Sequence, residues 1–120
     1  MAQVLLVGKD WKARALLRAQ LLEEGLEVEA CEQASEAIES LDRNELLPEL
    51  LIADLSASDD PAGEAELLAP WARQVPIWVI TSRSLIVDKK LKGRGFAMLL
   101  FRPIDLGELV EQIKQRLEKP

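Results

Sequence analysis

The sequence contains no histidine and a single cysteine, Cys31, among its 120 residues. Without histidine, histidine-based acid–base catalysis, a phosphohistidine relay and histidine metal ligation are excluded within this chain. One cysteine permits neither an internal disulfide nor a cysteine-cluster metal site. We expect Cys31 to be a small buried apolar residue, and the lack of a disulfide framework favours a reducing, cytoplasmic compartment.

Long apolar runs and an excess of basic residues are also missing. No segment approaches the roughly 20 apolar residues of a membrane-spanning helix, and Val4–Val7 is too short and lacks the basic flank of a signal peptide. The 15 lysines and arginines against 21 aspartates and glutamates give a formal net charge of −6, which argues against a nucleic-acid binder. No G-x-G-x-x-G or P-loop motif supports nucleotide binding. We therefore expect no membrane or nucleic-acid partner, and a nucleotide sensor is kept as an alternative without a motif to support it.

Apolar stretches alternate with helical patterns along the chain. The predicted strands are Val4–Val7, Leu26–Ala30, Leu50–Ala53, Ile77–Ile80 and Phe96–Phe101. The predicted helices are Trp11–Glu24, Ala34–Leu41, Glu64–Arg73, Leu85–Lys92 (a weak helix or a loop) and Asp105–Glu118. Continuous Val/Ile/Leu strands are typical of a parallel sheet covered on both faces, so residues 1–120 are predicted to form one doubly wound α/β domain.

The carboxyl ends of the strands are where such a sheet places its functional site. The chemistry-bearing residues at these ends follow the first, third, fourth and fifth strands. They are Gly8, Lys9, Asp10, Asp54, Thr81 and Arg102.

Four pieces of sequence carry a resemblance to a known family. They are VLLV followed by Asp10, PELLIADL around Asp54, VPIWVITS around Thr81, and FRPIDLGEL from Phe101 to Leu109. In this order and spacing, over essentially the whole chain, the sequence resembles a receiver domain of two-component response regulators. The resemblance implies a flavodoxin-like fold with a five-stranded parallel sheet of order 2-1-3-4-5 and five helices. It also implies a non-enzymatic signalling module whose protein partner is a histidine kinase or an output domain.

The resemblance assigns a role to each strand-end residue. In the family, an aspartate at the position of Asp54 accepts a phosphoryl group from a partner's histidine. The family neutralises charge with Mg²⁺, held by an acidic pair after the first strand together with the acceptor, and adds a hydroxyl, matched by Thr81, and a lysine. Here the acidic pair falls on Gly8 and Lys9, the lysine is Arg102, and the family's aromatic switch position holds Leu99.

These departures predict weak or absent Mg²⁺ binding, because Mg²⁺ requires several well-placed oxygen ligands. Asp10 follows the pair and is expected to point elsewhere. We hypothesise that the ammonium of Lys9 replaces the metal within salt-bridge reach of Asp54; the alternative is a solvated loop lysine. Arg102 is expected to point towards Asp54, and no residue is assigned as a metal ligand.

The predicted function is therefore that of an atypical receiver, a pseudo-receiver, acting through protein–protein contacts with impaired Mg²⁺-dependent phosphorylation. One alternative is a functional phosphoacceptor receiver modified at Asp54. A second is a small-molecule-sensing flavodoxin-like module that uses the crevice at the strand ends. The sequence is also compatible with a homodimer formed through the last helix.

The remaining predictions concern a group of basic residues, a turn and two tryptophans. Basic residues between the fourth strand and the end of the fifth form either a partner-docking face or an ordinary solvated face, and the candidates are Lys89, Lys90, Lys92 and Arg94. Ser58–Pro61 is interpreted as a solvated turn. Trp11 is expected to pack into the core at the start of its helix, with covering the site as the alternative, and Trp78 is expected to be buried within its strand.

Overall fold

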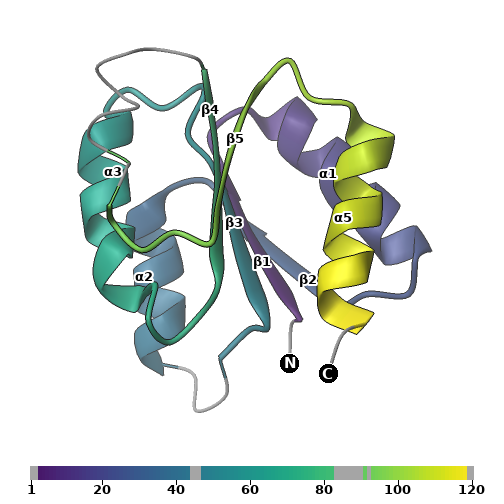
Figure 1. The fold of residues 1–120 in the computed structure, drawn as a ribbon, viewed down its shortest axis with the longest axis horizontal. Helices are drawn as coiled ribbons and strands as arrows, with labels where there is room; N and C mark the ends of the chain where they lie inside the picture. The colour runs from purple at the N-terminus through teal and green to yellow at the C-terminus, as the bar shows by residue number, and fades with distance from the viewer. Residues whose placement is uncertain (1–2, 44–46, 83–90, 92, 119–120) are drawn as a thin grey trace.

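A five-stranded parallel sheet lies between two layers of helices (Figure 1). The computed structural model describes residues 3–43, 47–82, 91 and 93–118. The strands are β1 (Val4–Gly8), β2 (Val28–Cys31), β3 (Leu50–Asp54), β4 (Ile77–Ser82) and β5 (Met98–Arg102). Their order in the sheet is β2-β1-β3-β4-β5, and every adjacent pair is parallel. The predicted sheet and its strand order are confirmed.

Four α-helices fall within the described residues. They are α1 (Trp11–Glu23), α2 (Ala34–Arg43), α3 (Pro61–Leu68), which continues into the short 3₁₀-helix η1 (Ala69–Trp71), and α5 (Leu106–Glu118). Helices α1 and α5 cover one face of the sheet, and α2 and α3 cover the other (Figure 1). A fifth helix was predicted over Leu85–Lys92, which lies outside the described residues except for Leu91. None of the helices in the described ranges is long and apolar enough to cross a membrane.

Alternation of side chains along the strands divides the core into two parts. Leu6, Ile52 and Trp78 pack on the side of α1 and α5, whereas Leu5 and Leu51 pack on the side of α2 and α3. Because successive side chains of a strand face opposite sides, Asp54 falls on the α1 and α5 side with Ile52. The register thus decides which helices surround the carboxylate.

Helix α1 begins where its sequence provides a cap. The side chain of Asp10 accepts hydrogen bonds from the backbone N–H groups of Lys12 (3.0 Å) and Ala13 (3.3 Å). These bonds satisfy N–H groups that have no partner within the helix. The prediction that Asp10 points away from the strand-end site is confirmed.

The prediction for α3 is wrong at both ends. The helix begins at Pro61, because the Asp60 side chain accepts a hydrogen bond from the Gly63 N–H (3.0 Å) and proline suits the first helical position. It gives way to η1 after Leu68, since Pro70 has no N–H to donate. The interpretation of Ser58–Pro61 as only a solvated turn is also corrected, because this segment contains the helix start.

The remaining elements differ from expectation mainly in burial. Strand β5 lies at the edge of the sheet and is half-buried, although a fully apolar strand was predicted there. Trp78 is buried as predicted. The prediction for Trp11 is wrong, because this side chain is 62% exposed, with the Lys12 ammonium 5.8 Å from its ring centroid. Cys31 is half-buried rather than fully buried.

Candidate functional site

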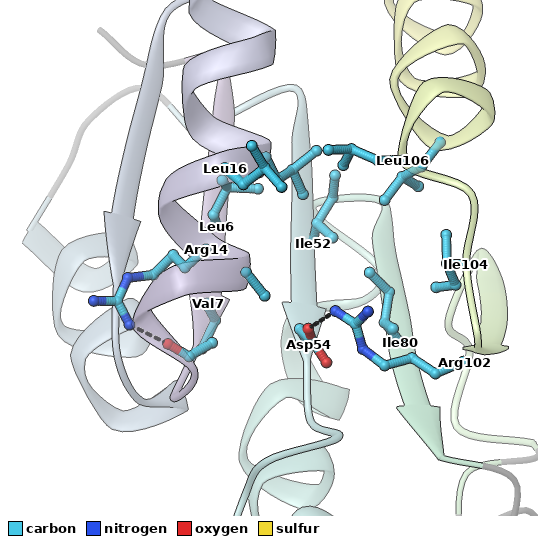
Figure 2. A pocket seen from close by; sticks show the side chains of 14 residues that line it. Leu6, Val7, Arg14, Leu16, Ile52, Asp54, Ile80, Arg102, Ile104 and Leu106 are labelled. Carbon is cyan, nitrogen blue, oxygen red and sulfur yellow. Dashed lines mark hydrogen bonds and ion pairs between the residues drawn. The ribbon is translucent and has the colours of Figure 1, made fainter.

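Three of the predicted site residues meet at the carboxyl edge of the sheet. Gly8 is the register partner of Asp54 in the β1–β3 pair, and Asp54 is the partner of Ile80 in the β3–β4 pair. Arg102, the last residue of β5, reaches across β4 to the same carboxylate (Figure 2). Residues from four separate parts of the chain therefore surround one position.

The carboxylate of Asp54 is bound by two neighbours. Its Oδ2 accepts a hydrogen bond from Arg102 Nη2 at 2.5 Å, and its Oδ1 accepts from both the N–H (3.0 Å) and the hydroxyl (2.5 Å) of Ser56. Arg102 Nε donates to the Ser56 hydroxyl oxygen at 3.0 Å, which closes the triad. The Asp54 side chain is 17% exposed. The expectation that Arg102 points towards Asp54 is confirmed.

Sequence reasoning missed Ser56. The available signal is its position two residues after an aspartate, where the side-chain carboxylate can accept from the following backbone N–H and shape a turn. The segment Asp54-Leu55-Ser56 has this spacing. The same serine also holds Arg102, a contact between residues 46 positions apart that no local pattern reveals.

The predicted ion pair between Lys9 and Asp54 is wrong. The Lys9 ammonium pairs with Asp59 in the loop after β3, while Asp54 pairs with Arg102. Gly8 lies beside Asp54, and the next residue turns to the opposite side of the sheet edge, towards α3. Lys9 is therefore no substitute for a metal at Asp54.

Lys9 instead neutralises an acidic hollow on the α2 and α3 side. The Asp59 carboxylate that accepts its hydrogen bond raises the pKa of Lys9, and the charges of Glu32 and Glu64 act in the same direction. Glu64 Oε1 also accepts a hydrogen bond from the Ala34 N–H at 2.8 Å, at the start of α2. Asp59 is thus used in pairing with Lys9 and Glu64 in binding the start of α2.

The hydroxyl of Thr81 is bound outside the Asp54 triad. Thr81 is buried in β4, and its hydroxyl donates to the Ser82 carbonyl at 3.5 Å, a long and weak contact. Ser82 is exposed and is the register partner of Arg102. Thr81 is not among the described residues that line the cavity next to Asp54.

The residues beside Asp54 do not fit a magnesium site of the family's kind. Gly8 has no side chain, Lys9 is a cation engaged with Asp59, and the Asp10 carboxylate caps α1. Across the described ranges, no group of three or more His, Cys, Asp or Glu side chains is arranged to hold a metal ion. A Cβ at position 8 would lie 3.5 Å from Asp54 Cβ, an ordinary contact, so the backbone leaves room there for a side chain.

The predicted basic face is only partly described. Lys89, Lys90 and Lys92 lie outside the described residues. Arg94 is described, and its Nη2 forms an ion pair with Glu66 Oε1 at 3.0 Å. Leu99, at the family's aromatic switch position, packs against the core cluster on the α2 and α3 side.

A cavity of about 190 Å³ extends from Asp54 between the sheet, α1 and α5 (Figure 2). Most of its lining is aliphatic. Among the described residues that line it, three carry charge, namely Arg14, Asp54 and Arg102. The Arg14 guanidinium donates to the Gly8 carbonyl and lies away from Asp54 (Figure 2).

Comparison with curated proteins finds a relative of similar length. It is a protein of Leptolyngbya boryana described as an uncharacterized 14.6 kDa protein in the sodA1 3′ region. The two sequences are 31% identical over 117 residues, which cover 93% of this chain and 87% of the relative. No family model matches the chain.

Comparison with solved structures finds receiver domains. A CheY-like receiver domain from Methanospirillum hungatei JF-1 has a TM-score of 0.82 at 21% identity, covering 98% of this chain and 94% of its own. The non-phosphorylated HemR receiver domain from Leptospira biflexa has a TM-score of 0.78 at 21% identity, with coverages of 100% and 97%. TrrA from Thermotoga maritima, solved with Mg²⁺ and BeF, has a TM-score of 0.74 at 22% identity, with coverages of 97% and 99%. These likenesses establish the response-regulator receiver fold.

Proposed function

This chain belongs to the same family as the 14.6 kDa Leptolyngbya boryana protein, and we propose that it works as an atypical receiver domain in signal transduction. It acts through contacts with a protein partner, and Mg²⁺-dependent phosphorylation at Asp54 does not control it. The observation that carries the proposal is the triad of Asp54, Ser56 and Arg102.

The triad supports the proposal on chemical grounds. A carboxylate that attacks a phosphoryl group needs its lone pairs free, and it needs positive charge placed on the oxygens around phosphorus. Here Oδ1 of Asp54 already accepts two hydrogen bonds and Oδ2 accepts one, so most of the acceptor capacity of the carboxylate is used. The guanidinium of Arg102 is bound to the nucleophile itself, so its charge is directed at Asp54 and not at the oxygens around phosphorus.

The absence of suitable metal ligands next to Asp54 supports the same conclusion. Mg²⁺ is held in proteins by near-octahedral oxygen donors, of which carboxylates contribute the charge. Neither Gly8 nor Lys9 offers such an oxygen from its side chain, and Asp10 is engaged in capping α1. Mg²⁺ binding at this edge is therefore proposed to be weak or absent.

The proposed mode of action is binding, without catalysis. A histidine kinase or an output domain is the kind of partner proposed, in a cytoplasmic setting. A phosphohistidine relay within the chain is excluded, because the chain has no histidine. Any phosphoryl group that reaches Asp54 must therefore come from a donor other than a histidine of this chain.

Intact mass spectrometry tests the proposal. The protein is incubated with Mg²⁺ and acetyl phosphate, and the fraction carrying one added phosphoryl group is measured. We expect no adduct in the wild type, because Asp54 is held by Arg102 and Ser56 without a metal. Asp54→Asn is the matched control, since it keeps the side-chain shape and removes the acceptor.

An adduct in the wild type that Asp54→Asn abolishes would overturn the proposal and establish a functional phosphoacceptor. An adduct of equal size in both proteins would show that a residue other than Asp54 is modified. Asp54 of the wild type would then remain unphosphorylated, as proposed.

A further inference from the structure

The cavity beside Asp54 has the character of a small-molecule site. Its wall is aliphatic on three sides, with Leu6, Ile52 and Ile80 from the sheet, Leu16 and Leu17 from α1, and Ile104, Leu106 and Leu109 from the start of α5 and the segment before it. Leu16 is 55% exposed at its mouth, so the cavity opens to solvent between α1 and α5. An apolar cavity of about 150 Å³ lined by aliphatic and aromatic side chains is large enough to hold benzene. The 190 Å³ here accommodates a ring or a short branched chain.

The charged groups around this cavity are unevenly placed. Its lining has two arginines and one carboxylate, but the Arg14 guanidinium donates to the Gly8 carbonyl and lies away from Asp54 (Figure 2). Ligand sites of this kind are mostly apolar, with a few polar groups that fix orientation. Arg102 is the cation with N–H donors at the Asp54 end, and a guanidinium matches a carboxylate and repels a cationic head group.

Arg102 has donors left for such an anion. A guanidinium offers five N–H groups in a fixed fork. Two are used, by Ser56 through Nε and by Asp54 through Nη2, and within the described ranges Nη1 has no acceptor. The guanidinium lies at the rim, between Asp54 and Ile104 (Figure 2), and its side chain is 39% exposed. An incoming carboxylate can bind Nη1 without breaking the triad.

We propose that this cavity binds a small monocarboxylate, with its apolar body between α1, α5 and the sheet and its carboxylate on Arg102. The inference goes beyond the proposed function, because it assigns a ligand class to a cavity that protein partnership does not require. Bound ligand would contact Arg102, the ion-pair partner of Asp54, which places the ligand at the edge of the sheet that holds the candidate site.

Binding is tested by NMR with isoleucine δ1-methyl labels and 3-phenylpropanoate as the probe. Ile52, Ile80 and Ile104 line the cavity, whereas Ile38 and Ile77 pack on the opposite side of the sheet. We expect saturable shifts of the first three methyl signals and none of the last two. Acetate has the carboxylate but lacks the apolar body, and 3-phenylpropanol has the apolar body but lacks the charge. Each should therefore bind at least about tenfold more weakly than 3-phenylpropanoate.

Variants at Ala13 and Arg102 test the ligand's apolar body and its carboxylate separately, and a variant at Ala15 is the control. Ala13→Leu fills the cavity, since Ala13 lines it, and Ala15→Leu adds the same atoms on the exposed side of the same helix. The first should weaken 3-phenylpropanoate binding at least about tenfold and the second by less than about twofold. Arg102→Met should weaken binding of 3-phenylpropanoate but not of 3-phenylpropanol. Circular dichroism verifies that each variant is folded.

The proposal is overturned if 3-phenylpropanoate causes no saturable shift in the wild type, or shifts all five methyl signals alike. It is also overturned if the alcohol binds as tightly as the carboxylate, or if Ala13→Leu and Ala15→Leu behave alike. These outcomes do not depend on phosphorylation of Asp54, so the proposed function and the ligand site can fail separately.

Discussion

Arginine at position 102 makes contacts that a lysine would not. Its planar fork reaches Asp54 through Nη2 and Ser56 through Nε at the same time. A lysine ammonium is a compact point charge on a flexible stem and does not reproduce this geometry. Arg102, one of the residues that depart from the receiver pattern, thus holds the Asp54 carboxylate together with Ser56.

A double-mutant cycle measures that contact. Asp54→Asn and Arg102→Met are made singly and together, and urea unfolding gives the free energy of unfolding of each protein. We expect a coupling energy of about 1 kcal/mol, because the carboxylate is largely buried and the hydrogen bond is charge-assisted. The matched control is Lys9→Met with Asp59→Asn, an ion pair whose side chains are 46% and 88% exposed and whose coupling should be smaller. Equal coupling in the two cycles would contradict this account of Asp54.

Cys31 provides a pH-dependent prediction. Burial raises the pKa of the Cys31 thiol to about 11, with the nearby Glu36 carboxylate acting in the same direction. A raised thiol pKa lowers the thiolate fraction at neutral pH, and only the thiolate reacts with alkylating agents. Iodoacetamide labelling of the folded protein should therefore be slow at pH 8 and accelerate only as the pH approaches the thiol pKa. The same chain in urea serves as the control, and equally fast labelling of both states would refute the prediction.

Among the elements, the helices and strands with a strong local sequence pattern are the ones that the sequence predicts correctly. Strands β1 and β3 are uninterrupted apolar runs, and α5 has apolar residues on one face after a capping aspartate, Asp105, which accepts from the Glu108 N–H. Helix α3 was misplaced because its start is set by Asp60 and Pro61, in a stretch whose composition indicates a turn. Capping chemistry outweighed composition there.

The cap of α3 is tested by two neighbouring aspartates. Asp60→Ala should lower the free energy of unfolding by about 1 kcal/mol, because the Gly63 N–H loses its acceptor. Asp59→Ala removes the same number of atoms one residue earlier, where the side chain is exposed and pairs with Lys9. Its effect on unfolding should be clearly smaller. Chemical denaturation of both variants gives the comparison, and a larger effect at Asp59 would contradict the assigned cap.

Over the whole molecule, the sheet separates the Lys9–Asp59 ion pair from the Asp54–Arg102 ion pair. The sequence alone places Lys9 and Asp54 at the same edge. Gly8, Lys9 and Asp54 are all strand-end residues, so the sequence and its resemblance locate them at one edge. Which side of that edge each side chain takes depends on register and on partners such as Asp59 and Ser56, which lie in loops without a periodic pattern. The site was therefore predictable as a set of positions, whereas its ion pairs were not.

The central claim is that Asp54 is a restrained carboxylate without a metal partner, and beryllofluoride binding tests it most directly. The wild type, Asp54→Asn and the double variant Gly8→Asp with Arg102→Lys are titrated with Mg²⁺ and beryllofluoride and followed by ¹⁹F NMR. The double variant adds a carboxylate at position 8, where a Cβ makes only an ordinary contact with Asp54, and it removes the guanidinium that holds Asp54. The account predicts no protein-bound fluorine signal for the wild type and a Mg²⁺-dependent one for the double variant. A bound signal in the wild type that is lost in Asp54→Asn would contradict it.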